Sequence, residues 1–476
     1  MTTHDRRAFL ALVLGALGGR AAGQAQRGAG ASPAPPRFEG QLASTARHLR
    51  AAADDWGRAV HRMPAAVLRP RTVGDVVRAV AYARERGLKV AMRGQGHCVS
   101  GQAQAAGGLV IDSSPLNHVA WHGTRALDAQ AGALWRDVAS RALTARRALP
   151  VLTDALVLSV GGTLSAGGTG DTSYRAGAQV DHVLELDVVT GTGALETCSP
   201  DRNRELFEMA LGGMGQCGLI VRARLRLVEA PHSVELRRLA YADLGRLLAD
   251  QVALCDAPIA TLEGQITPEE GGRWSLSLLV GAVTRGDAGG ARPGWLSGLG
   301  FAGEDAPASA RFWDHIDRRT KRLWASRLEP RPHPSLAMVL PEPAAAGLLA
   351  DIMSSASDRA GIWRIEVFPM VRERFVAPLH RLPEGPLSFT VRLQREASAE
   401  GAPDHHAMLE SNRRLAARMR AAGGKVYPPF APEQSPEDWR EHYGPDLWAR
   451  LAAAKARFDP DGLLTPGPGV FGGSRT

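Results

Sequence analysis

The chain carries the sequence Arg93-Gly94-Gln95-Gly96-His97-Cys98 directly after an apolar run at residues 89–92. A second apolar run follows at residues 108–112. Short apolar runs bounded by glycine-rich segments predict buried strands. Because glycine has no Cβ, the backbone N–H groups around Gly94 and Gly96 can come close to a phosphate. The segment therefore predicts a strand, a phosphate-binding loop and a second strand.

A helix is predicted just before this segment, over residues 72–87. Thr72 is a good N-cap residue, an apolar face follows it, and Gly87 is a typical helix end. No helix opens directly after the glycine loop, so the loop is not the G-x-G-x-x-G motif of a dinucleotide-binding βαβ unit. Taken alone, one glycine cluster also fits an ordinary tight turn.

Two more glycine-rich segments occur at residues 160–168 and 211–218. Alternating runs at 183–189 and 219–228 predict half-buried strands beside them, with a hairpin turn at 191–193. Three glycine clusters, each next to a strand, predict a shell of backbone that binds a pyrophosphate.

The pattern changes after residue 233, where longer helical periods alternate with strand periods. This mixture predicts an α+β second domain. An irregular apolar end is expected at 463–471. The helical periods lie at 241–257, 342–354, 405–423 and 438–460, and the strand periods at 274–279, 362–367 and 387–393.

The composition is that of a packed globular chain: 476 residues, 44% hydrophobic and 22% charged. The net charge of +8 is not concentrated in a basic block, so it is poor support for nucleic-acid binding. The four cysteines lack the spacing of a metal site or of a disulfide framework, and no metal is expected. They are Cys98, Cys198, Cys217 and Cys255.

The N-terminus reads Asp5-Arg6-Arg7-Ala8-Phe9-Leu10, followed by an apolar run and small residues up to residue 25. This is typical of a twin-arginine export signal over residues 1–25, and it is too short to span a membrane. A retained amphipathic anchor is the alternative. Residues 26–37 predict a disordered linker. We therefore expect a periplasmic or secreted protein that the twin-arginine machinery exports already folded, and no membrane span.

The segment 93–98, with 101–103 and 107–112, resembles the flavin-binding segment of cytokinin dehydrogenases in the vanillyl-alcohol oxidase superfamily. The resemblance continues in order along the mature chain. It implies an α+β, two-domain PCMH-type FAD-binding fold, with an FAD-binding domain at 38–233, a substrate (cap) domain at 234–430 and a C-terminal segment at 431–476 that returns to the FAD domain. Further resembling motifs include Asp55-Trp56-Gly57, Thr153-Asp154, Gly161-Gly162-Thr163, His333-Pro334 and Phe458-Asp459-Pro460.

By this resemblance His97 bonds covalently to the flavin, and the loop around it wraps the FAD pyrophosphate. No cysteine lies between residues 149 and 161, so we expect a single attachment, with Cys98 a neighbour of the cofactor. Cys98, Thr169 and Pro468 depart from the family's usual serine, apolar residue and glutamine. The positions that bind FAD in the family are Gly94, Gln95, Gly96, His97, Cys98, Gln102, Asp154, Ser159, Ser165, Thr169, Ile220, Tyr427, Thr465 and Pro468.

The resemblance assigns catalysis to two carboxylates. Asp154 takes the N–H proton of a secondary amine while the adjacent carbon loses hydride to flavin N5, and water splits the resulting imine. Glu263 binds the purine ring of the substrate. Reduced flavin passes its electrons to oxygen or to a quinone-like acceptor. From the residues alone, Asp154 also fits an Asx-type turn and Glu263 a solvated strand face.

The substrate domain departs from the family more than the flavin segment does. Ala155 follows the base where a tyrosine is usual, Pro428 replaces a leucine, and Phe368-Pro369-Met370 replaces a Pro-Leu-Asn segment. These changes alter the pocket wall more than the chemistry. Alternatives are an FAD-dependent oxidase of a sugar or alcohol on the same fold, a flavin-binding protein without turnover, and a nucleic-acid binder that salt-dependent retention on DNA would reveal.

Overall fold

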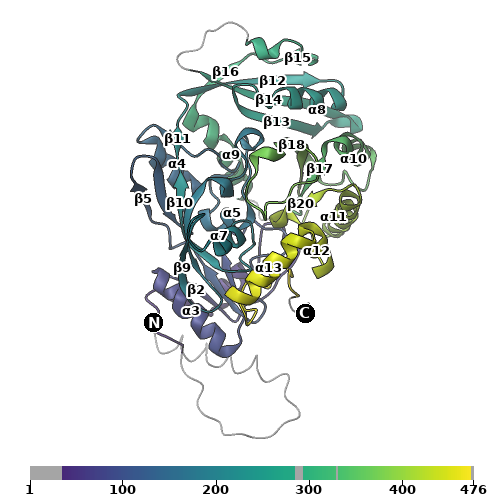
Figure 1. Ribbon diagram of the computed structural model, residues 1–476. Helices are drawn as coiled ribbons and strands as arrows, with labels where there is room; N and C mark the ends of the chain where they lie inside the picture. The colour runs from purple at the N-terminus through teal and green to yellow at the C-terminus, as the bar shows by residue number, and fades with distance from the viewer. Residues whose placement is uncertain (1–34, 285–292, 328–330, 473–476) are drawn as a thin grey trace, which may run out of the picture.

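The computed structural model of the chain describes residues 35–284, 293–327 and 331–472. The predicted export signal at 1–25 and residues 26–34 of the predicted linker lie outside these ranges. Figure 1 shows one part built on smaller sheets and a second part built on one large sheet, with the C-terminal helices beside both.

The first sheet has four strands in the order β1-β2-β4-β3, with β2 and β3 both parallel to β4. Helix α3 (Val73–Arg86) connects β2 to β3, begins with a capping box between Thr72 and Asp75, and ends at Gly87 with φ 62°. The predicted helix at 72–87 and the two predicted strands are thus confirmed to within one residue. The strands are β1 (Gln41–Ala43), β2 (Ala66–Arg69), β3 (Val90–Arg93) and β4 (Leu109–Asp112), and α2 (Ala46–Ala52) packs against β2.

The second sheet has five antiparallel strands in the order β5-β6-β10-β8-β9. Its β8–β9 hairpin confirms the predicted strand at 183–189 and the predicted turn, where Gly193 has φ 83°. The strands are β5 (Val119–His122), β6 (Ala126–Gln130), β8 (Val183–Val189), β9 (Leu195–Cys198) and β10 (Leu219–Arg226), and β7 (Arg147–Ala148) pairs separately with β11 (Val228–Glu229).

One glycine-rich segment folds differently from expectation. Residues 160–168 were expected to contribute a loop, but most of them form the short helix α5 (Val160–Ala166). A Cβ at Gly161 would lie 2.6 Å from the Cβ of Ala131. Here the glycine therefore lets a helix pack closely on its neighbour rather than open a turn. Other helices of this part are α4 (Trp135–Leu143), α6 (Ser173–Ala176), α7 (Arg204–Ala210) and the 3₁₀ turn η1 (Gln179–His182).

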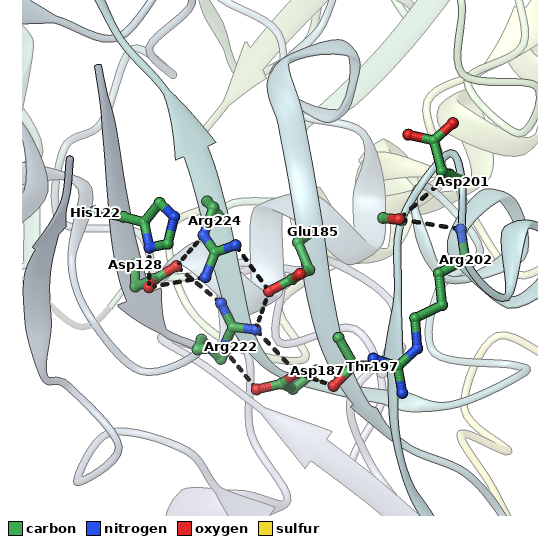
Figure 2. A network of polar contacts seen from close by, with 10 residues as sticks. His122, Asp128, Glu185, Asp187, Thr197, Asp201, Arg202, Arg222 and Arg224 are labelled. Carbon is green, nitrogen blue, oxygen red and sulfur yellow. Dashed lines mark hydrogen bonds and ion pairs between the residues drawn. The ribbon is translucent and has the colours of Figure 1, made fainter. Parts of the chain in front are cut away.

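Arginine residues alternate with apolar residues along β10, as predicted, and two of them form an ionic network with β6 and β8. Figure 2 shows Arg222 and Arg224 pointing toward the same carboxylates. Arg222 donates to Asp187 at 2.6 Å, to Glu185 at 2.6 Å and to Asp128 at 2.8 Å. One guanidinium group thus neutralises carboxylates from two neighbouring strands.

The large sheet has nine strands, and all its pairings are antiparallel. The path runs β15-β12-β14-β13-β18-β19-β17-β20, with β16 also on β12. Together with the helices that lie between its strands in the sequence, this sheet confirms the predicted α+β second domain. Its strands are β12 (Ser233–Tyr241), β13 (Ile259–Pro268), β14 (Trp274–Thr284), β15 (Gly303–Glu304), β16 (Ala308–Arg311), β17 (Leu336–Pro341), β18 (Ile362–Val371), β19 (Leu387–Arg395) and β20 (Lys425–Val426).

Four longer helices pack against the large sheet: α8 (Leu244–Ala253), α9 (Phe312–Arg327), α10 (Glu342–Ser354) and α11 (Pro403–Ala421). The helix predicted at 241–257 begins later, because Tyr241 still belongs to β12 and Asp243 caps α8 by accepting from Arg246 N at 2.8 Å. Helix α9 was not predicted. It joins the two parts, since Thr320 accepts from the backbone N–H of Leu156 at 2.9 Å.

The predicted helical tail at 438–460 is two helices, α12 (Pro436–Tyr443) and α13 (Pro445–Phe458). Gly444, with φ 76°, breaks the helix before Pro445, which has no N–H to continue it. The end then returns to the first sheet: Leu464 bridges Val90, and Thr465 N donates to Val90 O at 2.7 Å. The predicted return of the C-terminus to the FAD-binding part is confirmed.

In the described ranges, no helix has the length and apolar character needed to cross a membrane. Across those same ranges no group of three or more histidine, cysteine, aspartate or glutamate side chains is placed to hold a metal ion. The four cysteines are free thiols.

Candidate active site

A deep cavity lies between the glycine clusters and the large sheet. Its volume is about 310 Å³, within the roughly 300–1,000 Å³ of pockets that bind small ligands. The predicted site residues that line it are Gly94, Gln95, Gly96, His97, Cys98, Gln102, Asp154, Ser159, Ser165, Thr169, Ile220, Tyr427 and Thr465.

The loop at 93–98 has the geometry of a cofactor cradle. A Cβ at Gly94 would lie 2.0 Å from Ser159 Oγ, and a Cβ at Gly96 would lie 2.0 Å from the Arg93 guanidinium. Gly96 also has φ 66°, a conformation that other residues adopt reluctantly. Both glycines line the cavity, and neither position has room for a side chain, which fits a loop whose backbone binds an FAD pyrophosphate.

The glycine loop is held to the C-terminal part by the side chain of Gln102. Its Nε2 donates to the carbonyls of Pro428 at 3.1 Å and Ala431 at 3.2 Å, while its Oε1 accepts from Ser100 N at 2.9 Å. Gln102, which was predicted to bind FAD, therefore holds the glycine loop in place and also lines the cavity.

Asp55 gives the same loop a second support. One carboxylate oxygen accepts from Gly101 N at 2.7 Å and the other from Gly57 N at 3.1 Å. Burial raises the pKa of Asp55 to about 6, although the N–H groups of Gly101 and Arg58 and the charge of Arg93 act in the opposite direction. The sequence showed Asp55 only as part of a motif, and the structure shows that it ties two distant turns together.

Aromatic rings surround His97. Its ring centroid lies 4.9 Å from that of Trp56 and 5.8 Å from that of Phe430, and Trp56 stacks on His333 at 4.1 Å. These contacts fix the plane of the imidazole at the cavity wall. Burial raises the pKa of the neighbouring Cys98 thiol to about 12, so Cys98 remains a neutral, weakly nucleophilic thiol at neutral pH.

Tyr427 and Thr465 bring two more glycine clusters to the cavity. The Tyr427 hydroxyl accepts from Gly168 N at 3.2 Å, and Thr465 Oγ1 donates to Gly215 O at 3.1 Å. Burial raises the pKa of Tyr427 to about 12, which keeps the phenol neutral. The three glycine clusters that the sequence singled out therefore meet around one cavity.

The structure gives Asp154 an ionic partner that the sequence did not reveal. Asp154 lies in the segment before α5, and Arg392 on β19 donates a hydrogen bond to it. The same Arg392 Nη1 donates to Glu366 at 3.1 Å, and Gln394 donates to Glu366 at 3.2 Å. Burial alone would lower the pKa of Arg392, but the charges of Asp154 and Glu366 raise it above its ordinary value. Arg392 therefore remains a cation beside the proposed base.

Arg392 was missed because an arginine on an alternating strand is normally on the solvated face. Its side chain is only 11% exposed, since the face of β19 that carries it is turned toward the cavity rather than to bulk water. Arg392 is buried because the large sheet packs against the FAD-binding part, and the local sequence pattern does not show that contact.

Two of the predicted site residues do not line the cavity. Glu263 is fully buried on β13, where Gln265 donates to it at 3.0 Å. Gln265 in turn pairs across the strands with Glu366, so Glu263 lies one strand away from the cavity wall. Pro468 contributes its carbonyl to a hydrogen bond from Trp439 Nε1 at 2.9 Å. Their assigned roles in substrate and FAD binding stay predictions.

Comparison with known families gives two matches along the chain. Residues 64–199 match the family described as FAD binding domain. Residues 305–471 match the family described as Cytokinin dehydrogenase 1, FAD and cytokinin binding. The two matches cover the cradle, the cavity wall on β18 and β19, and the C-terminal return.

Whole-chain relatives agree with these matches. The chain is 32% identical to cytokinin dehydrogenase 5 of Oryza sativa subsp. japonica over 502 residues, covering 91% of each chain. It is 36% identical to an uncharacterized oxidoreductase, ORF5 in the fasciation locus of Rhodococcoides fascians, over 432 residues, covering 88% of this chain and 96% of that one.

Among solved structures, 6-hydroxy-D-nicotine oxidase from Arthrobacter nicotinovorans matches with a TM-score of 0.71 at 21% identity, covering 91% of this chain and 98% of that one. At this identity the likeness concerns the fold, which is the two-domain PCMH-type FAD-binding fold. With the family matches and the relatives above 30% identity, it leads to one conclusion: the chain belongs to the cytokinin dehydrogenase family and is an FAD-dependent oxidoreductase.

Proposed function

We propose that the protein oxidises the secondary amine of a cytokinin-like, N6-substituted adenine to an imine, which water then hydrolyses to adenine and an aldehyde. The observation that carries the proposal is the position of Asp154, whose carboxylate lines the same cavity as His97 and the glycine cradle. The match of residues 305–471 to a cytokinin-binding family supports the substrate class.

Asp154 accepts the proton from the amine nitrogen. A general base must be ionised and correctly oriented before the substrate arrives. Arg392 serves the second need, because its hydrogen bond fixes the direction of the Asp154 carboxylate. FAD, when bound, accepts the hydride that leaves the carbon next to nitrogen.

His97 is the proposed point of covalent attachment to FAD, and Cys98 is only its neighbour. The ring contacts of His97 with Trp56 and Phe430 hold the imidazole in one orientation, which favours reaction at a single flavin carbon. Glu263 is proposed to bind the purine ring. Oxygen or a quinone-like molecule is the proposed electron acceptor.

The proposal includes export through the twin-arginine machinery, directed by the Arg6-Arg7 motif. That route carries folded proteins and so suits a chain that acquires its cofactor in the cytoplasm. The place of action would then be periplasmic or extracellular.

One observation favours a second candidate, an oxidase of sugars or alcohols. Arg364, Glu366 and Gln394 give the cavity a polar wall that could bind several hydroxyl groups. Amine oxidation remains the first proposal, because residues 305–471 match a family described as binding FAD and cytokinin.

The visible spectrum of the purified protein separates the two candidates. Anaerobic addition of N6-isopentenyladenine is expected to bleach the oxidised flavin bands, whereas adenine, which lacks the oxidisable carbon, leaves them unchanged. Bleaching by simple sugars or alcohols but not by the substituted adenine would contradict amine oxidation.

A further inference from the structure

A second cavity lies in the segment that connects β18 to β19, and every residue that lines it falls within positions 371–386. Its volume is about 750 Å³, within the roughly 300–1,000 Å³ of pockets that bind small ligands. Among the described residues, none lines both this cavity and the candidate active site. It is therefore a separate site, and the proposed function does not use it.

The segment around the second cavity is held in a fixed shape. The Asp181 carboxylate on η1 accepts from Val376 N at 3.0 Å and from Ala377 N at 2.7 Å. Arg372 Nη1 donates to Pro383 O at 2.8 Å and so joins the two ends of the segment. The cavity is thus formed before a ligand arrives, as small-molecule sites usually are.

Two guanidinium groups, those of Arg372 and Arg381, line the cavity. Within the described ranges neither forms an ion pair with a carboxylate, and Arg381 makes no hydrogen bond. Only the Nε of Arg381 is buried without a partner, so its terminal Nη groups remain accessible to a ligand.

The charges around Arg381 favour an anion beside it. Burial lowers the pKa of Arg381 and the charge of Arg372 acts in the same direction, against the smaller effects of Glu384 and Tyr443. Glu373 also lines the cavity, but its carboxylate already pairs with Arg374 at 3.2 Å. A negative ligand would therefore relieve the repulsion between two cations that lack a counter-ion.

The rest of the wall is apolar and aromatic. The rings of Phe375 and His380 stack, with centroids 5.3 Å apart and planes 9° apart. Burial lowers the pKa of His380 to about 4, so its ring is neutral at neutral pH. Val376 is 79% exposed and also lines the cavity. A ligand with an apolar body would cover this surface and gain the free energy of its burial.

We propose that the second cavity is a binding site for a small organic carboxylate whose apolar body is about the size of one ring. Arg381 pairs with the carboxylate, Arg372 adds a second positive charge, and the Phe375–His380 stack packs against the body. A guanidinium group suits a carboxylate because its donors match the two oxygens. The inference goes beyond the proposed function, because it concerns a different ligand at a different site.

His380 brings this site close to the candidate active site. Its ring centroid lies 6.2 Å from that of Tyr427, which lines the first cavity. A Cβ at Gly167, in the second glycine cluster, would lie 2.3 Å from His380 Nδ1. Because the two cavities are neighbours, the test must show which of them binds the carboxylate.

The test is isothermal titration calorimetry of the holoenzyme with benzoate at low salt. The dissociation constant is expected to be about 1 mM or lower, which is reasonable for a ligand of this size. Benzamide keeps the ring without the charge, and acetate keeps the charge without the ring. Each is expected to bind about 10-fold more weakly or worse. Benzoate that binds no more tightly than both, or shows no saturable binding, would overturn the inference.

Arg381→Gln is expected to weaken benzoate binding by about 10-fold or more, because the carboxylate loses a charged donor, and to leave benzamide binding unchanged. Phe375→Leu is expected to weaken benzoate binding by about 3-fold, because the aromatic stack is lost. Arg413→Gln, at an exposed position on α11, is the matched control and should bind benzoate as the wild type does. Unchanged benzoate binding in Arg381→Gln would contradict the assignment.

Arg364→Gln changes an arginine of the first cavity and tells the two sites apart. It is expected to leave benzoate binding unchanged. If it weakens the binding while Arg381→Gln does not, benzoate binds in the candidate active site and the inference fails. The comparison of benzoate with benzamide and acetate needs no variant, so it decides even if a variant does not fold. None of these measurements requires amine oxidation, so the inference and the proposed function succeed or fail separately.

Discussion

Arg392 on β19 donates a hydrogen bond to Asp154, a residue 238 positions earlier in the chain, and so joins the substrate domain to the flavin domain across the cavity. The contact places a permanent cation beside the proposed base. The orientation of the base therefore depends on how the large sheet packs on the FAD-binding part, because the hydrogen bond joins these two parts of the chain.

Asp154→Asn is expected to bind flavin normally but to slow flavin reduction by an amine by about 10² to 10⁴-fold, because the amide cannot accept the substrate proton. Stopped-flow reduction at saturating substrate measures the effect. Asp256→Asn is the matched control, since the Asp256 side chain is 95% exposed. A limiting rate near that of the wild type would remove Asp154 from the mechanism.

Glu263→Gln should change a different kinetic parameter from Asp154→Asn. Because Glu263 is proposed to orient the ring, its loss should mainly raise the substrate concentration needed for half-maximal reduction, with little effect on the limiting rate. A large fall in the limiting rate with unchanged substrate dependence would argue that Glu263 acts elsewhere, as its position one strand from the cavity wall also allows.

His97→Ala is expected to hold FAD only reversibly. Acid precipitation should leave the flavin with the wild-type polypeptide and release it from the variant, and the absorption of the supernatant measures the released fraction. His406→Ala, which changes an exposed histidine, should retain the flavin as the wild type does. Quantitative release from the wild-type protein would show that the covalent bond does not exist.

Arg222→Met is expected to lower the free energy of unfolding by about 2 to 4 kcal/mol, because Asp187 loses its cation and the partly buried Asp128 and Glu185 are left to share Arg224 alone. Urea unfolding monitored by circular dichroism gives the value. Arg226→Met lies on the same strand but at an exposed position, and it should change stability by less than about 0.5 kcal/mol. Similar effects of the two substitutions would mean that the network seen in Figure 2 contributes little.

The stability of the protein should fall as the pH drops below about 6.5, and His442 is one cause. Burial lowers the pKa of His442 to about 3, and the nearby cations of Lys425 and Arg381 act in the same direction. Below pH 6.5 the unfolded chain takes up a proton at this histidine while the native protein does not, so acid favours unfolding. The stabilising effect of the neutral ring is present above pH 6.5 and is lost progressively toward pH 3.

The difference in melting temperature between pH 7 and pH 5 measures this dependence. It should be smaller in His442→Gln than in the wild type, even though the substitution also lowers stability at pH 7 by disturbing the ring contacts with Trp439 and Tyr443. His406→Gln, at an exposed position, should leave the difference unchanged. An identical pH dependence in His442→Gln would show that His442 is not responsible.

Export should depend on the paired arginines. A reporter fused to residues 1–37 is expected to leave the cytoplasm, and replacing both Arg6 and Arg7 by lysine should abolish its export, because the twin-arginine machinery reads the arginine pair and not the charge alone. Fractionation of the cells measures the exported share. Export at full rate after both replacements would assign the signal to the general route for unfolded chains.

The local pattern of the sequence was enough to predict several elements and the glycine clusters around the flavin. Helix α3 and the β8–β9 hairpin follow from a capping residue, side-chain periodicity and glycine at positive φ, all of which act between neighbours in the chain. Local patterns failed where a distant contact decided the outcome, as at Gly161, whose missing Cβ allows α5 to pack on Ala131.

Only the tertiary structure brought Arg392 to Asp154 and turned Glu366 and Gln394 toward the cavity. An arginine that alternates with apolar residues has the same pattern whether its face meets water or a cavity, because the period of a strand fixes which residues share a face and not what that face meets. The register of β18 on β19 and the packing of the large sheet on the flavin domain determine that, and both depend on contacts between residues far apart in the sequence.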